Sequence, residues 1–86
     1  MMFDTVRMGS EGVSVYVLQT VLRMLLFKGA DGKPLDIDGS AGDNTVFAIN
    51  SFQSTIRSYG YEVGSDGEND GTFGEKCWKC LLGGDF

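Results

Sequence analysis

Apolar residues recur every three or four positions in three stretches of this 86-residue chain, which is the spacing of helices buried along one face. The stretches predict helices over about 12–27, 43–58 and 74–82. Alternation of apolar and polar residues over four or more positions is nearly absent, so we predict an all-α domain, a small three-helix bundle spanning 1–86. The expected buried positions are Val15, Leu18, Leu22 and Leu25, with Val21 and Leu26 beside them, then Ala48, Ile49, Phe52 and Ile56, then Cys77, Trp78, Leu81 and Leu82.

Glycine and polar residues dominate the two long connections. Residues 28–37 hold the only proline and predict a loop, with Leu35 and Ile37 as its anchors in the core. Residues 61–72 predict an exposed, turn-rich connection, compatible with a short hairpin. At the start of the second helix we expect a side-chain oxygen of Asp43 or Asn44 to cap the free amides.

An eight-residue pattern occurs twice. Residues 38–45 read Asp-Gly-Ser-Ala-Gly-Asp-Asn-Thr, and residues 70–77 read Asp-Gly-Thr-Phe-Gly-Glu-Lys-Cys. Aspartate and glycine favour a tight turn, because the carboxylate accepts from nearby amides and glycine tolerates positive φ. Each copy is followed by apolar residues at helical spacing. The repeat is therefore predicted to form a turn that starts a helix.

Charge and composition narrow the function. The chain carries 7 basic and 12 acidic residues, a net charge of -5, which argues against a nucleic-acid partner. No apolar run approaches the length of a membrane span, so we expect no membrane partner. The first residues lack the features of a signal peptide, so we expect a protein that is cytoplasmic as synthesised.

No catalytic constellation is visible, and we predict neither an enzyme nor a cofactor or metal site. Histidine is absent, and no Gly-x-Ser-x-Gly motif occurs. Cys77 and Cys80 are interpreted as small core residues three apart on a helix, with a redox pair or half a zinc site as alternatives. Residues 66–71 also suggest a calcium loop, but its twelfth position is Cys77 where such a loop requires glutamate.

Three ordered blocks covering residues 7–82 resemble the peptidoglycan-binding domain family. The blocks are Gly9-Ser10-x-Gly12-x-x-Val15-x-x-Leu18-Gln19-x-x-Leu22-x-x-Leu25, Asp38-Gly39-x-x-Gly42-x-x-Thr45-x-x-Ala48-Ile49-x-x-Phe52-Gln53 and Asp70-Gly71-x-Phe73-Gly74-x-x-Cys77-Trp78-x-x-Leu81. The resemblance implies a three-helix module in which the repeated loops line a groove. It also implies a non-catalytic function: attachment to the stem peptide or muropeptide of bacterial cell walls, as in wall hydrolases and phage endolysins. The chain would then act at the cell wall, once released or as part of a lytic system.

Carried over by position, the resemblance implies ten ligand-binding residues. These are Asp38, Gly39, Ser40, Gly42, Asn44 and Thr45 from the first loop, and Asp70, Gly71, Phe73 and Trp78 from the second. To them we add Arg57 as a partner for a stem-peptide carboxylate, and Tyr59 and Tyr61 as rings for a muropeptide or sugar.

Purely structural roles compete with these assignments. The two loop aspartates can serve as turn and cap residues, and Phe73 and Trp78 as core aromatics. Gln19 and Gln53 are interpreted as interior amides bonded to the backbone.

The chain departs from the family pattern at four places. Leu26 stands where the family commonly has glycine, so the first helix is expected to run on; Phe27 stands for tyrosine, and Cys77 for threonine. The extra segment 57–63 is expected to lengthen the second helix and place two tyrosines beside the groove. The alternative function is a free-standing phage or bacterial intracellular protein that sequesters a small ligand, binds a protein partner or forms a homo-oligomer.

Overall fold

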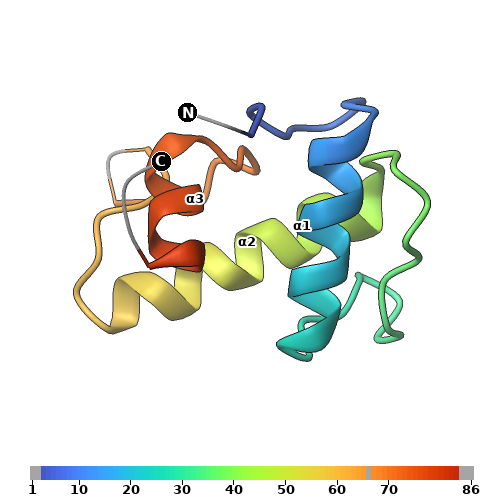
Figure 1. The fold of residues 1–86 in the computed structure, drawn as a ribbon. Coiled ribbons are helices and arrows are strands. Elements are labelled where there is room, and N and C mark those ends of the chain that lie inside the picture. The colour runs from blue at the N-terminus through green and yellow to red at the C-terminus, as the bar shows by residue number, and fades with distance from the viewer. Residues whose placement is uncertain (1–2, 66, 84–86) are drawn as a thin grey trace.

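Three helices make up the regular structure of the computed structural model, which describes residues 3–65 and 67–83. They are α1 (Val13–Met24), α2 (Asp43–Ser58) and α3 (Glu75–Leu82), and the described residues contain no strand. Figure 1 shows α2 running across the molecule, with α1 crossing it near one end and α3 lying beside its other half. The predicted all-α class is confirmed.

The bounds of α2 and α3 lie within one residue of the prediction, but the end of α1 was predicted wrongly. Leu26 adopts φ 69°, in the left-handed region, and this stops the helix at Met24. The Leu26 amide donates to the Arg23 carbonyl, and the Phe27 amide donates to the Leu22 carbonyl. This is a Schellman motif, which satisfies the last carbonyls of a helix. Leucine therefore occupies a position that usually belongs to glycine, and the helix does not run on.

That ending also changes which apolar side chains are buried. Leu25 is 52% exposed and Leu26 81% exposed, so neither belongs to the core as predicted. Leu35 anchors the following loop as expected, whereas Ile37 is 39% exposed and does not. Leu82, at 37% exposed, is also outside the core.

The helix starts differ from the prediction as well. The N-cap of α2 is Gly42, with no side-chain cap, so neither Asp43 nor Asn44 fills that role. Both residues already lie within or at the first turn of the helix, and there the side chains do not reach back to the free amides. Gly74 is the N-cap of α3 in the same way. The two copies of the repeat thus start their helices with glycine.

Aromatic rings form the centre of the core. Phe73 lies between Phe52 and Trp78, with ring centroids 5.2 and 4.9 Å away. The Trp78 ring is fully buried, and its Nε1 donates to the Asp4 carbonyl at 3.0 Å, which satisfies its one polar atom. These contacts join α2, α3 and the N-terminal segment.

The N-terminal segment joins the two repeated loops through backbone hydrogen bonds. Val6 and Phe73 exchange both amide-to-carbonyl bonds, at 3.0 and 2.7 Å. A few residues on, the Gly9 amide donates to the Ala41 carbonyl, and the Ala41 amide donates to the Ser10 carbonyl, each at 2.8 Å. Ala41 and Phe73 are equivalent positions of the repeat, so one segment fixes the same point of both loops.

The remaining connections contain only isolated bridges. Lys28 pairs with Pro34 in the first, and Ser65 pairs with Glu68 in the second. The second bridge fits the short hairpin that the sequence allows for residues 61–72. None of the described helices has the length and apolar character needed to cross a bilayer.

Candidate functional site

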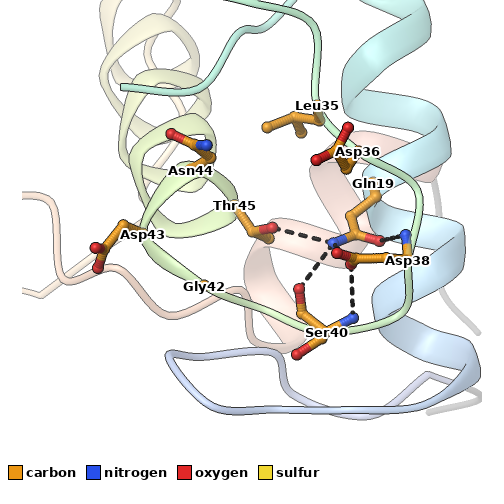
Figure 2. Close-up of a pocket in the computed structure, with 9 residues that line it drawn as sticks. All are labelled: Gln19, Leu35, Asp36, Asp38, Ser40, Gly42, Asp43, Asn44 and Thr45. Carbon is orange, nitrogen blue, oxygen red and sulfur yellow. Dashed lines mark hydrogen bonds between the residues drawn. The ribbon is translucent and has the colours of Figure 1, made fainter. Parts of the chain in front are cut away.

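A buried glutamine holds the first repeated loop. Gln19 lies on α1 and is 1% exposed. Its Oε1 accepts from the amides of Asp38 and Gly39 at 3.0 and 2.9 Å. Its Nε2 donates to Asp38 Oδ1, the Ser40 carbonyl and Thr45 Oγ1, all within 3.0–3.1 Å (Figure 2). One side chain therefore fixes the start, middle and end of the loop.

A second glutamine does the same for the second loop. Gln53 on α2 is fully buried, and its Oε1 accepts from the Asp70 amide at 3.1 Å. Its Nε2 donates to Asp70 Oδ1 at 2.8 Å and to the Thr72 carbonyl at 3.0 Å. Where the first loop offers a threonine hydroxyl, the second offers Cys77 Sγ at 3.6 Å, a weaker acceptor. The predicted role of both glutamines as interior amides is confirmed.

The repeat extends further along the chain than the loop motif shows. Four residues after each glutamine, an arginine donates Nη1 to the carbonyl of a buried residue: Arg23 to Leu35 at 3.1 Å, and Arg57 to Val63 at 3.3 Å. Seven residues after each glutamine, the chain adopts positive φ, at Leu26 and at Gly60. Each unit of the repeat is thus a helix, a left-handed stop and a loop that starts the next helix.

The two loop aspartates are turn residues in the structure. Asp38 Oδ1 accepts from the Ser40 amide, and Asp70 Oδ1 accepts from the Thr72 amide, both at 3.0 Å. The hydrogen bond from the Ser40 amide, with that from Gln19, lowers the pKa of Asp38 below its ordinary value. Burial opposes ionisation of Asp70, but its bonds from Gln53, Thr72 and Ser65 outweigh burial and lower its pKa too. Both carboxylates are therefore ionised at neutral pH.

The aspartates differ in their second oxygen. Ser65 Oγ donates to Asp70 Oδ2 at 2.8 Å. Among the described residues no donor reaches Asp38 Oδ2, because both side-chain and backbone donors meet Oδ1. The first loop thus keeps an unpaired carboxylate oxygen, and the second does not.

A cavity of about 350 Å³ lies at the first loop, between that loop, α1 and the start of α2 (Figure 2). Three of its lining residues are acidic, namely Asp36, Asp38 and Asp43, and none of its described lining residues is basic. Asp36 and Asp43 are exposed, and their side chains accept no hydrogen bond from the described residues. The other lining residues are Gln19, Leu35, Ser40, Gly42, Asn44 and Thr45.

An equivalent cavity of about 300 Å³ lies at the second loop. Asp70, Thr72, Gly74, Glu75, Lys76 and Cys77 line it, each the repeat equivalent of a residue in the first cavity, and Gly64 completes it. Asn44 of the first loop is replaced by Lys76 in the second. The repeated loops therefore form two similar hollows of different charge.

The residues expected to bind a ligand are divided among several places. Five of the six from the first loop line one cavity; the sixth, Gly39, is buried with φ 75°, and a Cβ there would collide with the Tyr16 ring. Arg57 and Tyr61 line a third cavity of about 350 Å³ near the end of α2. Tyr59 is 75% exposed and lines none of these cavities.

Three residues from the second loop line none of the three cavities described. Phe73 and Trp78 are fully buried in the aromatic core, which agrees with the structural alternative considered for them. Gly71 is half-buried against Val46. The expected groove residues of the second loop are thus reduced to Asp70 at its cavity.

Two carboxylates of the first cavity escaped the sequence reasoning. Asp43 belongs to the loop motif, but its position was interpreted as a helix cap. Asp36 lies outside the motif and precedes Asp38 by two residues, a spacing that places side chains on one side wherever the backbone is extended. This spacing was the available signal.

The described part of the chain provides no geometry for a metal site or for a reactive thiol. No group of three histidine, cysteine or acidic residues there is placed to hold a metal ion. The suggested calcium loop includes residue 66, which lies outside the described residues. Both thiols are free; burial raises the pKa of Cys77, against its bond from Gln53, and burial also raises that of Cys80. Neither thiol is activated as a nucleophile.

Comparison of the chain with models of protein families, with curated proteins and with solved structures found no match.

Proposed function

We propose that this chain is a non-catalytic module that binds bacterial peptidoglycan, with the cavity of the first loop as its ligand site. One observation carries the proposal: five of the six first-loop residues named by the sequence resemblance line a single cavity.

The chemistry of this cavity favours a ligand that donates hydrogen bonds or carries positive charge. Its lining residues Asp36 and Asp43 carry carboxylates that accept no hydrogen bond from the described residues, and Asp38 Oδ2 likewise has no donor among them. Hydrogen bonds to charged acceptors are stronger than those between neutral groups. The amide groups and the amine of a stem peptide, and the hydroxyls of an adjoining sugar, supply such donors. Ser40, Asn44 and Thr45 add neutral polar groups at the same surface.

The loop is held in place before any ligand arrives. Gln19 fixes it from the helix side, and the N-terminal segment fixes it at Ala41. A fixed loop does not lose conformational freedom on binding, which favours affinity. We assign the site no catalytic step, because Asp38 is committed to the turn and the chain has no histidine.

A sedimentation assay with purified cell walls tests the proposal. We expect the protein to pellet with the walls, and the double variant Asp36→Asn with Asp43→Asn to bind at least about tenfold more weakly. The matched control, Asp4→Asn with Glu11→Gln, removes the same charge from exposed residues outside the cavity and should bind like the parent. Absence of pelleting above an unrelated protein would refute the function, and equal binding by both double variants would refute the site.

One observation favours the alternative of a protein partner or a homo-oligomer. Met24, Leu25 and Leu26 are consecutive and 75%, 52% and 81% exposed, which forms an apolar tip at the end of α1. Sedimentation velocity over a concentration series checks self-association. A mass that rises with concentration, and that returns to the monomer in Met24→Ser with Leu26→Ser, would support it; a constant monomer mass would remove the homo-oligomer.

A further inference from the structure

The third cavity has a charge opposite to that of the first. It lies near the end of α2, and Arg57, Tyr61 and Lys76 are among the residues that line it. Among the described residues that line it, Glu62 is the only carboxylate. Two cations against one anion is an unusual local balance in a chain whose net charge is -5.

Arg57 is held in position by neutral groups. Its Nη1 donates to the Val63 carbonyl at 3.3 Å, and its Nη2 donates to Asn69 Oδ1 at 2.6 Å. The side chain is half-buried, and no carboxylate forms an ion pair with it in the described part of the chain. Each terminal nitrogen has a second N–H, and Nε has one, so donors remain for another acceptor. A guanidinium placed in this way is a preorganised donor with no counter-ion among the described residues.

Lys76 places a second charge at the same opening. It is exposed, and no hydrogen bond or ion pair engages its ammonium group among the described residues. Lys76 also lines the cavity of the second loop, and Gly64 is the other residue that the two cavities share. The equivalent residue of the first loop, Asn44, is neutral, and its side-chain oxygen accepts a hydrogen bond from the Ala30 amide. Lys76 therefore marks a difference in charge between two units that otherwise repeat each other.

A glycine lets the backbone turn tightly beside Arg57. Gly64 has φ 84°, and a Cβ there would collide with the Glu68 carbonyl. Only glycine lets this turn close beside Arg57. The hairpin of Ser65 and Glu68, with amide-to-carbonyl bonds of 2.9 and 3.0 Å, fixes the other side of the turn.

We infer that the cavity lined by Arg57, Tyr61 and Lys76 is a second ligand subsite, which binds the free carboxylate of a peptide. A carboxylate suits a guanidinium and an ammonium that converge on one opening, and the Tyr61 ring offers an apolar face to the adjoining methyl group. This inference rests on the proposed function, because it assigns the carboxyl end of the stem peptide to this cavity. The first-loop cavity, with its three carboxylates, then takes donor groups of the wall.

Titration of the full chain by NMR, with a short peptide as the probe, tests the inference. The probe is N-acetyl-lysyl-D-alanyl-D-alanine, and the matched probe is the same peptide with its carboxylate amidated. We expect the acid to shift the signals of the Arg57 Nε–H and of the Lys76 and Tyr61 amides. The amidated peptide should bind about tenfold more weakly or worse, because its terminus no longer forms a charge-assisted bond. A salt concentration of 0.5 M should weaken binding of the acid, because the site is partly exposed.

A charge variant at this cavity, compared with a control variant elsewhere, distinguishes binding at the cavity from a general electrostatic effect on binding. Lys76→Gln should weaken binding of the acid about fivefold, a typical effect for an exposed cation. Lys33→Gln removes the same charge from an exposed lysine that lines none of these cavities, and should leave the affinity unchanged. Neither substitution removes a side-chain bond of the fold, so both variants should melt as the parent does.

Three results would overturn the inference. They are equal binding of the acid and the amide, equal effects of the two lysine variants, and binding of inorganic phosphate at these signals with higher affinity than the acid. The outcome is distinct from that of the wall assay. If the protein pellets with walls but shows no preference for the acid peptide, the proposed function stands without this subsite. If it prefers the acid peptide but does not pellet with walls, the cavity is a carboxylate site that does not serve peptidoglycan binding.

Discussion

Replacing Leu26 by glycine should stabilise the protein. Leu26 has φ 69° and is 81% exposed, so it adopts a left-handed backbone while its side chain makes little contact with the core. The equivalent stop at the end of α2 has the same hydrogen bonds, with Gly60 at φ 96°. The stop at Gly60 therefore serves as an internal reference for the backbone conformation of Leu26.

The magnitude follows from two opposing terms. A residue with a Cβ in the left-handed region costs about 1–2 kcal/mol. Glycine loses more backbone freedom on folding than leucine does, and this loss offsets about 0.4–1 kcal/mol of the gain in stability. We therefore expect Leu26→Gly to raise the free energy of unfolding by about 0.5–1 kcal/mol. For a domain of this size each kcal/mol corresponds to about 4–8 °C in the melting temperature, so the expected rise is about 2–8 °C.

Urea denaturation and thermal melting, followed by circular dichroism, measure the effect. Leu26→Ala is the control, because it removes the same exposed side chain but keeps the Cβ, and it should bring no comparable gain. The reciprocal variant Gly60→Ala should lose about 1 kcal/mol by the same strain, since no atom lies within 4 Å of the added Cβ to confuse the result. If Leu26→Gly is no more stable than Leu26→Ala, or if Gly60→Ala is neutral, the strain argument is wrong.

Two further predictions concern the repeated loops. Cys77→Thr gives Gln53 a hydroxyl acceptor like the one that Thr45 offers to Gln19, whereas Cys77→Val keeps a similar shape without a strong acceptor. In urea denaturation the threonine variant should be more stable than the valine variant by about 1 kcal/mol. Equal stabilities of the two variants would contradict the role of this hydrogen bond. Asp38 and Asp70 have lowered pKa values in the fold, so their contribution to stability is present above the unfolded value of about 3.9 and is lost as the pH falls through the folded values. The melting temperature should thus fall below about pH 4, and less steeply in Asp38→Asn with Asp70→Asn; an identical slope in parent and variant would count against these bonds.

The helices and the loop repeat were open to prediction because local sequence controls them. Apolar residues at helical spacing located α2 and α3, and the two Asp-Gly-x-x-Gly copies located the turns that precede them. The end of α1 was missed for a local reason. A leucine gives no sign that it will adopt positive φ, and the hydrogen bonds that hold it there involve residues that look helical in the sequence.

The candidate site was predictable only in part. Asp38, Ser40, Gly42, Asn44 and Thr45 were found because the motif keeps them close in sequence. Motif position does not state which side chains face outward, and so Phe73 and Trp78, which the core buries, were counted with the loop.

What the sequence by itself determined is the repeating unit: an apolar helix, a turn and a glycine that starts the next helix. These depend on spacing and on the conformational preferences of single residues. Only the tertiary structure decided how the two units differ. Asp36, two residues before Asp38, lines one hollow together with Asp38 and Asp43, and Arg57 and Lys76, which belong to different helices, line another. The charge of a cavity is a sum over the residues that folding brings together, and therefore the motif alone does not set it.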